Sequence, residues 1–144
     1  MKKSKKTVSK TISVSPEAAW QVIGAVSGVD KWFAPLIQTC KVEGDKRYCT
    51  TEGGLLEEDV LEVNHEDRIF RYGIPEQPIM PVENIFGTMK VLEAGNNQAT
   101  IEWTAEFEVQ PEKEAEAKQM FEEAYGMGIQ GIENYILAQE VVQS

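Results

Sequence analysis

Hydrophobic and polar residues alternate near the N-terminus, which is the pattern of a strand with one covered face. Val8, Ile12 and Val14 fall on one side of this strand, and serines and threonines fall on the other. Residues 15–17, Ser-Pro-Glu, then have the features of a helix start: a capping serine, a proline that fits the first turn and an acid that complements the helix dipole. The pattern predicts a strand followed by two short helices, the second over residues 29–33.

Residues 36–109 form a succession of short alternating stretches that are separated by turn residues. The breaks fall at residues 44–45, 52–54, 64–67, 75–81 and 95–97. In the clearest stretch, 99–109, apolar residues alternate with threonines and glutamates. Because one covered and one solvated face is typical of an antiparallel sheet, this segment predicts about six antiparallel strands.

A final helix is predicted to begin at Pro111 and to reach about Val142. Its apolar residues recur at helical spacing and form one stripe. The stripe consists of Phe121, Tyr125, Gly128, Ile132 and Ile136. The predicted fold class is α+β, with a curved antiparallel sheet of about seven strands wrapped around this long C-terminal helix. We expect a single domain over residues 1–144, in which residues 1–6 form a frayed basic arm.

Three glycines, Gly126, Gly128 and Gly131, lie inside the predicted final helix. Each is expected to cost about 1 kcal/mol of helix stability relative to alanine, so their presence asks for a physical reason. Two interpretations stay open. The helix packs closely against the sheet at these positions, or the missing side chains leave space for a ligand.

The composition is that of an ordinary globular protein, with 144 residues of which 42% are hydrophobic and 26% charged. The formal charge is −10, but five lysines lie within the first ten residues, so residues 11–144 hold 9 basic and 24 acidic residues, a balance of −15. Such a surface repels phosphate backbones, and we expect no nucleic-acid partner. No apolar run approaches the roughly 18–20 residues of a membrane span, and two cysteines are too few for a disulfide scaffold, so we expect a cytoplasmic protein without stable membrane association.

A series of short motifs runs in order from Thr7 to about Leu137. The motifs are Ser15-Pro16 with Trp20 and Ile23, Asp30-Lys31-Trp32-Phe33-Ala34-Pro35, Lys46-Arg47-Tyr48-Cys49-Thr50, Leu56-Glu57-Glu58-Asp59-Val60, Arg68 with Tyr72 and Ile74, Pro81-Val82-Glu83-Asn84, and Trp103 with Phe107. This ordered set resembles the polyketide cyclase/dehydrase and lipid-transport family of the START-like, or pollen-allergen-like, helix-grip superfamily. The sequence departs from the usual Trp-x-Pro pattern of that family, because two residues separate Trp32 from Pro35.

The resemblance implies a helix-grip fold with a deep cavity between the sheet and the C-terminal helix. Proteins similar to this one bind apolar small molecules there, and some catalyse the cyclisation or dehydration of polyketides. The residues expected to line the cavity are Trp32, Arg47, Glu58, Phe70, Tyr72, Ile79, Ile85, Met89, Trp103, Phe107, Phe121, Tyr125 and Gly128. We expect no cofactor, no metal, and a monomer or a weak homodimer.

Glu58 is the carboxylate that most merits attention, because strand alternation places it on the same face as Leu56 and Val60. If that face is interior, burial raises the pKa of the carboxyl group, and Arg47 on the preceding strand lowers it. Three interpretations stay open: a polar anchor or general acid/base for a ligand, an ion pair with Arg47 that fixes strand register, or a bulged strand with Glu58 in water.

The remaining candidates have simpler explanations. His65, the one histidine, lies in a turn and is expected to be solvated. Cys40 and Cys49 are expected on neighbouring strands as buried free thiols, since they lack the spacing of a zinc site. Residues 75–81 hold three prolines around Ile79, and this segment forms either the rim of a cavity or a stiff crossover loop.

The leading hypothesis is a binding protein for an apolar or amphipathic small molecule, such as a lipid, a polyketide-like compound or an aromatic. The first alternative is a cyclase- or dehydratase-type enzyme that uses Glu58 as general acid/base. The second alternative is an interaction module whose interior is filled and whose acidic surface meets a basic partner.

Overall fold

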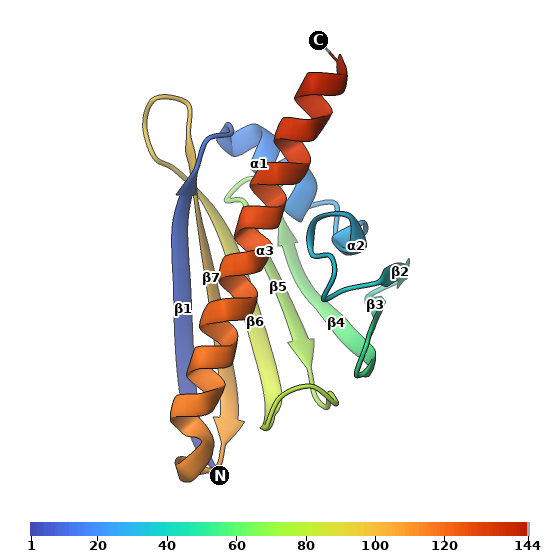
Figure 1. Ribbon diagram of the computed structural model, residues 1–144, viewed down its shortest axis with the longest axis vertical. Helices are drawn as coiled ribbons and strands as arrows, with labels where there is room; N and C mark the ends of the chain where they lie inside the picture. Colours follow the sequence, from blue (N-terminus) through green and yellow to red (C-terminus); the bar gives the residue numbers. More distant parts are fainter. Residues whose placement is uncertain (144) are drawn as a thin grey trace.

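The computed structural model describes residues 1–143, and their side chains as far as residue 140. A curved antiparallel sheet has its seven strands in the order β1-β7-β6-β5-β4-β3-β2. The strands are β1 (Lys2–Ile12), β2 (Thr39–Glu43), β3 (Lys46–Thr51), β4 (Gly54–Asn64), β5 (Ile69–Ile74), β6 (Val82–Glu93) and β7 (Ala99–Val109). The helices are α1 (Pro16–Ile23), α2 (Val29–Trp32), a 3-10 turn over Pro111–Lys113, and α3 (Glu114–Gln143). Helix α3 runs along one face of the sheet in front of β1 and β7, with α1 and α2 beside its C-terminal half (Figure 1).

The predicted fold class is confirmed, and the local signals that predicted its elements are visible in the structure. The hydroxyl of Ser15 accepts a hydrogen bond of 3.1 Å from the backbone N–H of Ala18, so this serine caps α1 as expected. At the other end of the chain, Pro111 opens a separate 3-10 turn, and the long helix begins at Glu114 rather than at the proline. None of the described helices is long and apolar enough to cross a membrane.

The prediction of a frayed basic arm over residues 1–6 is wrong, because β1 already begins at Lys2. Lys2 lies opposite Val109 of β7, and the pairing continues to Ile12 without a break. The lysine side chains find acids on α3: Lys2 Nζ lies 3.0 Å from a carboxylate oxygen of Glu114, and Lys6 Nζ lies 3.3 Å from one of Glu122. Partners that lie more than a hundred residues away therefore order a segment whose local composition favours disorder.

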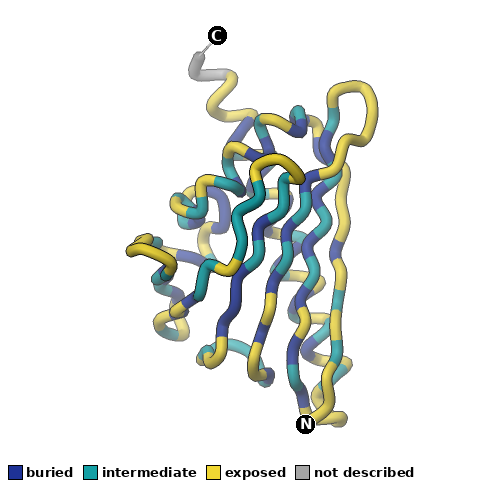
Figure 2. The backbone as a smooth tube through the Cα atoms, turned by 180° about the vertical axis from the view of Figure 1, so that it is seen from behind, coloured by how far each residue is buried: buried dark blue, intermediate teal, exposed yellow. Residues whose placement is uncertain are grey.

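The core lies between the sheet and α3. Buried residues alternate with half-buried or exposed ones along much of β6 and β7, as the view from behind shows (Figure 2). On α3 the predicted stripe is buried, and Ile129, which the stripe omitted, joins it. The largest fully buried side chains are Phe70, Ile101, Ile129, Ile132, Val109 and Cys49.

Two of the three helix glycines mark close packing. A Cβ atom at Gly131 would lie 1.8 Å from the backbone oxygen of Trp32, and one at Gly128 would lie 2.8 Å from the ring of Trp103. A Cβ atom at Gly126 would meet nothing within 4 Å. Close packing is therefore the correct interpretation for Gly128 and Gly131, and neither position leaves space for a ligand.

Candidate functional site

A cavity of about 410 Å³ lies between the sheet, α2 and α3. Most of its wall is apolar, and the polar groups on it are few. The lining residues are Val29, Trp32, Phe33, Leu36, Ile37, Arg47, Cys49, Leu56, Glu58, Tyr72, Ile74, Gln77, Ile79, Met80, Ile85, Met89, Trp103, Met120, Phe121, Glu123, Ala124, Tyr125 and Met127. This volume contradicts the filled interior that the interaction-module hypothesis requires.

The structure brings most of the predicted site residues together on this wall. Those that line it are Trp32, Arg47, Glu58, Tyr72, Ile79, Ile85, Met89, Trp103, Phe121 and Tyr125. Three predicted residues do not line it. Phe70 lies beneath the guanidinium of Arg47 at 5.0 Å, Phe107 packs against Phe121 with ring centroids 4.8 Å apart, and Gly128 packs against Trp103.

Sequence reasoning missed several lining residues, and two groups of them lie together. The first is the loop Phe33–Ile37, which has no periodic pattern that predicts which side chains point inward. The second is a flank of α3 beside the buried stripe: Met120, Ala124 and Met127. Their helical spacing is visible in the sequence, but spacing alone does not separate a cavity wall from a packed core.

Arg47 and Glu58 form a buried ion pair on the cavity wall. The two residues lie directly opposite each other on β3 and β4, and the Nε–H of Arg47 donates to Oε1 of Glu58. Each is 6% exposed. Burial is the largest single effect and lowers the pKa of Arg47, but the charge and hydrogen bond of Glu58, with smaller contributions from Cys49 and Tyr72, together raise that pKa above its ordinary value. Of the three interpretations of Glu58, the bulged strand with Glu58 in water is wrong.

Arg47 also joins the sheet to the linker between α1 and α2. Its Nη1–H donates to the backbone oxygen of Val26 at 2.8 Å. Val26 has a left-handed backbone with φ of 67°, a conformation that β-branched residues rarely adopt. One side chain therefore holds both the carboxylate on β4 and a strained turn of the helical layer.

Three aromatic side chains form a second polar group in the cavity. The hydroxyl oxygens of Tyr72 and Tyr125 lie 3.0 Å apart, and Nε1–H of Trp103 donates to the Tyr72 hydroxyl at 3.0 Å. The rings of Trp103 and Tyr125 stack with centroids 3.9 Å apart. Burial raises the pKa of Tyr72 to about 12 and that of Tyr125 well above its ordinary value. Both hydroxyl groups are therefore protonated at neutral pH.

The raised pKa of Tyr72 predicts a pH dependence of stability. Because the unfolded chain loses this proton near pH 10 and the folded protein near pH 12, the free energy of unfolding is expected to fall between these values. The slope from this group alone is about 1.4 kcal/mol per pH unit. Urea unfolding at about pH 9 and about pH 11 measures it. Tyr72→Phe should show a shallower decline than the wild type, and equal slopes would contradict the assignment.

Cys40 and Cys49 lie opposite each other on β2 and β3, as expected. Their sulfur atoms are 2.9 Å apart, with Cys49 as donor, and both thiols are free. Cys49 is buried on the cavity wall, whereas Cys40 is half-buried. The hydrogen bond from Cys49 lowers the pKa of Cys40 to about 7, against the opposing effect of burial. A large fraction of Cys40 is therefore thiolate at neutral pH, the form that reacts with oxidants.

Hydrogen peroxide is expected to join this cysteine pair. The Cys40 thiolate attacks the peroxide and becomes a sulfenic acid, and Cys49 displaces water from it to give a disulfide. Mass spectrometry without reductant should find a loss of two hydrogens, reversible by dithiothreitol. Cys49→Ser should instead accumulate the sulfenic acid and its higher oxidation products. If the wild type behaves like this variant, the pair is not poised for disulfide formation.

The other candidate groups lie outside the cavity. His65 is exposed in the turn between β4 and β5, and its Nδ1 accepts a hydrogen bond of 3.0 Å from Nε1–H of Trp20. Across the described residues, no group of three or more histidine, cysteine, aspartate or glutamate side chains is placed to hold a metal ion. The polar and charged groups on the cavity wall are thus the Arg47–Glu58 pair, the aromatic hydroxyls, the Cys49 thiol, Gln77 and Glu123.

The curved sheet, the gripping helix and the cavity between them define a helix-grip protein. The family model for polyketide cyclase/dehydrase and lipid transport matches residues 4–136, and the chain belongs to this family. No curated protein matches the sequence.

Solved structures share the fold of this chain. A protein XoxI from Bacillus cereus is 28% identical with a TM-score of 0.84, and the match covers 95% of this chain and 98% of that one. An uncharacterised protein from Bacillus thuringiensis is 27% identical, also with a TM-score of 0.84, over 93% and 99% of the two chains. Norcoclaurine synthase from Thalictrum flavum shares the fold at 14% identity, with a TM-score of 0.77 over 94% of each chain.

Proposed function

We propose that the protein binds an apolar or amphipathic small molecule in the cavity between the sheet and α3. The observation that carries the proposal is the cavity itself: about 410 Å³, with a largely apolar wall and a few convergent polar groups. This volume lies within the range of about 300–1,000 Å³ that small-molecule sites occupy. The family description, which includes lipid transport, supports the same class of ligand.

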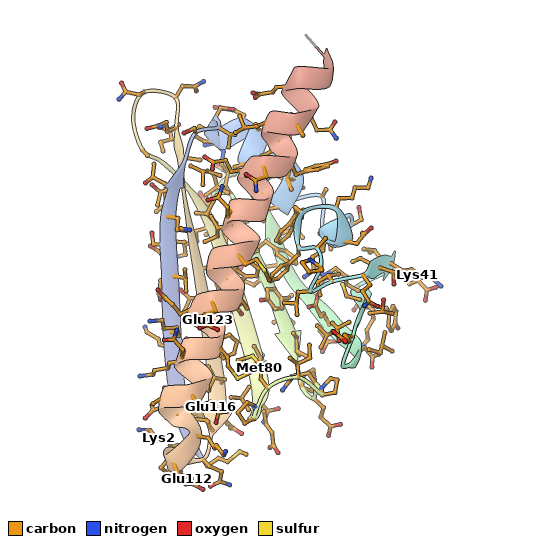
Figure 3. All side chains as sticks on the ribbon, viewed as in Figure 1. Lys2, Lys41, Met80, Glu112, Glu116 and Glu123 are labelled. Carbon is orange, nitrogen blue, oxygen red and sulfur yellow. The ribbon has the colours of Figure 1, made fainter. Side chains whose placement is uncertain are left out.

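The loop between β5 and β6 forms a structured part of the cavity wall. Ile79 and Met80 line the cavity, and Figure 3 shows Met80 beside the lower half of α3, near the ends of β5 and β6. The side chain of Gln77 holds this loop, because its amide donates to the backbone oxygens of Met80 and Val82 and accepts from two backbone N–H groups of the loop. We infer that this loop, held in one conformation by Gln77, forms the rim of the cavity entrance through which a ligand enters.

A thermal-shift screen with fatty acids, flavonoids and polyketide-like aromatics tests the proposal. A ligand at about 100 times its Kd adds about 2.7 kcal/mol of stability, which raises Tm by several degrees for a domain of this size. Ala124→Phe places a ring in the cavity and should abolish the response, whereas Gln130→Phe on the exposed side of α3 should keep it. A library that leaves Tm unchanged would count against a binding function.

A second candidate is an enzyme of the cyclase or dehydratase type. The observation that favours it is the carboxylate of Glu58 on the cavity wall, where it is placed to exchange a proton with a bound carbonyl compound. For an enzyme, Glu58→Gln should lower turnover by about a hundredfold while the fold persists. For a binding protein, the same variant should change affinity without any turnover to lose.

A further inference from the structure

The aromatic group leaves one of its three hydrogen-bond donors without an acceptor among the described residues. Trp103 N–H and the hydroxyl groups of Tyr72 and Tyr125 supply three donors. Trp103 N–H donates to the Tyr72 oxygen, and one of the two hydroxyl protons forms the bond between the tyrosines. The other hydroxyl proton has no acceptor among the described residues. Since both tyrosines line the cavity, a bound molecule is placed to supply the acceptor that a buried donor requires.

The ion pair offers the complementary group. Glu58 uses Oε1 to accept from Arg47, and its Oε2 makes no hydrogen bond with the described residues. Within that same part of the chain, Trp32 Nε1 is the one side-chain polar atom that is both fully enclosed and unpartnered. The free oxygen of Glu58 is therefore not sealed inside the protein, and it reaches the cavity that Glu58 lines.

The charged side chains on the cavity wall carry a net negative charge, which disfavours an anionic ligand. Arg47 is already neutralised by Glu58, and the remaining charged residue on the wall is Glu123. A carboxylate head group would enter the apolar interior without a free cation to pair with, and an unpaired buried charge is costly. A cationic ligand that paired with Glu58 would lie beside the guanidinium of Arg47, and the two positive charges would repel each other.

The two polar groups are near enough to contact one molecule. Val60 pairs with Tyr72 across β4 and β5, so Glu58, two residues earlier on the same face, is a diagonal neighbour of Tyr72. Diagonal positions on a sheet are about 7–8 Å apart. A single ring with its substituents spans such a distance.

We propose that the cavity selects an uncharged ligand that donates a hydrogen bond to Glu58 and accepts one from the Tyr72–Tyr125 pair, on an otherwise apolar body. Hydroxyaryl ketones have this chemistry, and fatty acids do not. This inference rests on the proposed function of the cavity.

Four matched probes test it by isothermal titration calorimetry. They are 4-hydroxydihydrochalcone, dihydrochalcone without the hydroxyl, 4-(3-phenylpropyl)phenol without the carbonyl, and 4-(3-oxo-3-phenylpropyl)benzoate, in which a carboxylate replaces the hydroxyl. We expect the hydroxy ketone to bind about tenfold or more tightly than either molecule that lacks one polar group. The carboxylate should bind most weakly.

Glu58→Gln supplies a reversal of the same preference. In this variant the charge of Arg47 has no counter-charge, so the carboxylate probe should gain about tenfold in affinity while the hydroxy ketone loses affinity. Far-UV circular dichroism checks that the variant is folded. If it is not, the comparison of the four probes on the wild type still tests the inference. Equal binding of all four probes by the wild type would overturn the inference but leave the proposed function intact. Binding of none of them, together with a negative thermal-shift screen, would overturn both.

Discussion

Replacing Glu58 by alanine is expected to lower the free energy of unfolding by about 3–5 kcal/mol. Arg47, which is 6% exposed, then keeps its charge in an apolar interior without a partner. The charge is costly there because burial removes its hydration. The hydrogen bond that remains is to the backbone oxygen of Val26, which has no net negative charge to neutralise the guanidinium. Urea unfolding followed by tryptophan fluorescence measures the loss.

Two control variants separate the buried charge from other causes. Asp59→Ala removes the neighbouring carboxylate, whose bond of 2.6 Å to Lys46 lies on the exposed side of β4, and should cost about 1 kcal/mol or less. The double variant Arg47→Met with Glu58→Leu removes both charges and should recover most of the lost stability. If the double variant is as unstable as Glu58→Ala, the buried charge is not the cause.

Alanine at Gly131 is expected to destabilise the protein, whereas alanine at Gly126 should stabilise it. At Gly131 the new Cβ atom would lie 1.8 Å from the backbone oxygen of Trp32, so α2 or α3 must move. A backbone atom cannot swing aside as a side chain does, and we expect a loss of about 2–3 kcal/mol. At Gly126 nothing lies within 4 Å, and the better helix propensity of alanine should add about 1 kcal/mol.

Thermal denaturation of the two glycine variants gives opposite shifts. For a domain of this size, each kcal/mol corresponds to about 3 °C in Tm. Gly126→Ala is the matched control, because it makes the same substitution on the same helix. A rise in Tm for both variants would mean that α2 does not press on α3 at Gly131.

Local periodicity predicts most of the elements, and it groups Glu58 with Leu56 and Val60 without deciding whether their face is interior. The alternation of β7 predicts which of its side chains are buried, because one face of an antiparallel sheet is covered. Parity puts Glu58 and Leu56 on one face, and the structure decides that this face is interior, since both residues are buried. These features depend on the neighbours of a residue in sequence, which the sequence displays directly.

Local periodicity does not predict features that depend on contacts with residues far away in the sequence. Residues 1–6 have the composition of a disordered arm, but pairing with β7 makes them a strand, and glutamates on α3 add ion pairs to two of their lysines. Gly126 and Gly131 are identical as residues, and the position of Trp32 decides which one tolerates a side chain. The inward direction of the loop Phe33–Ile37 likewise follows from where α2 packs against α3.

The hydrogen bond from Arg47 to the backbone oxygen of Val26 connects the ion pair on β3 and β4 to the turn between α1 and α2. The left-handed conformation of Val26 costs energy, which its surroundings must offset. A molecule that draws Glu58 away from Arg47 therefore also alters what holds the turn between α1 and α2 in place. Ligand binding in the cavity is thus expected to change the hydrogen-exchange rates of the backbone amides of residues 24–28.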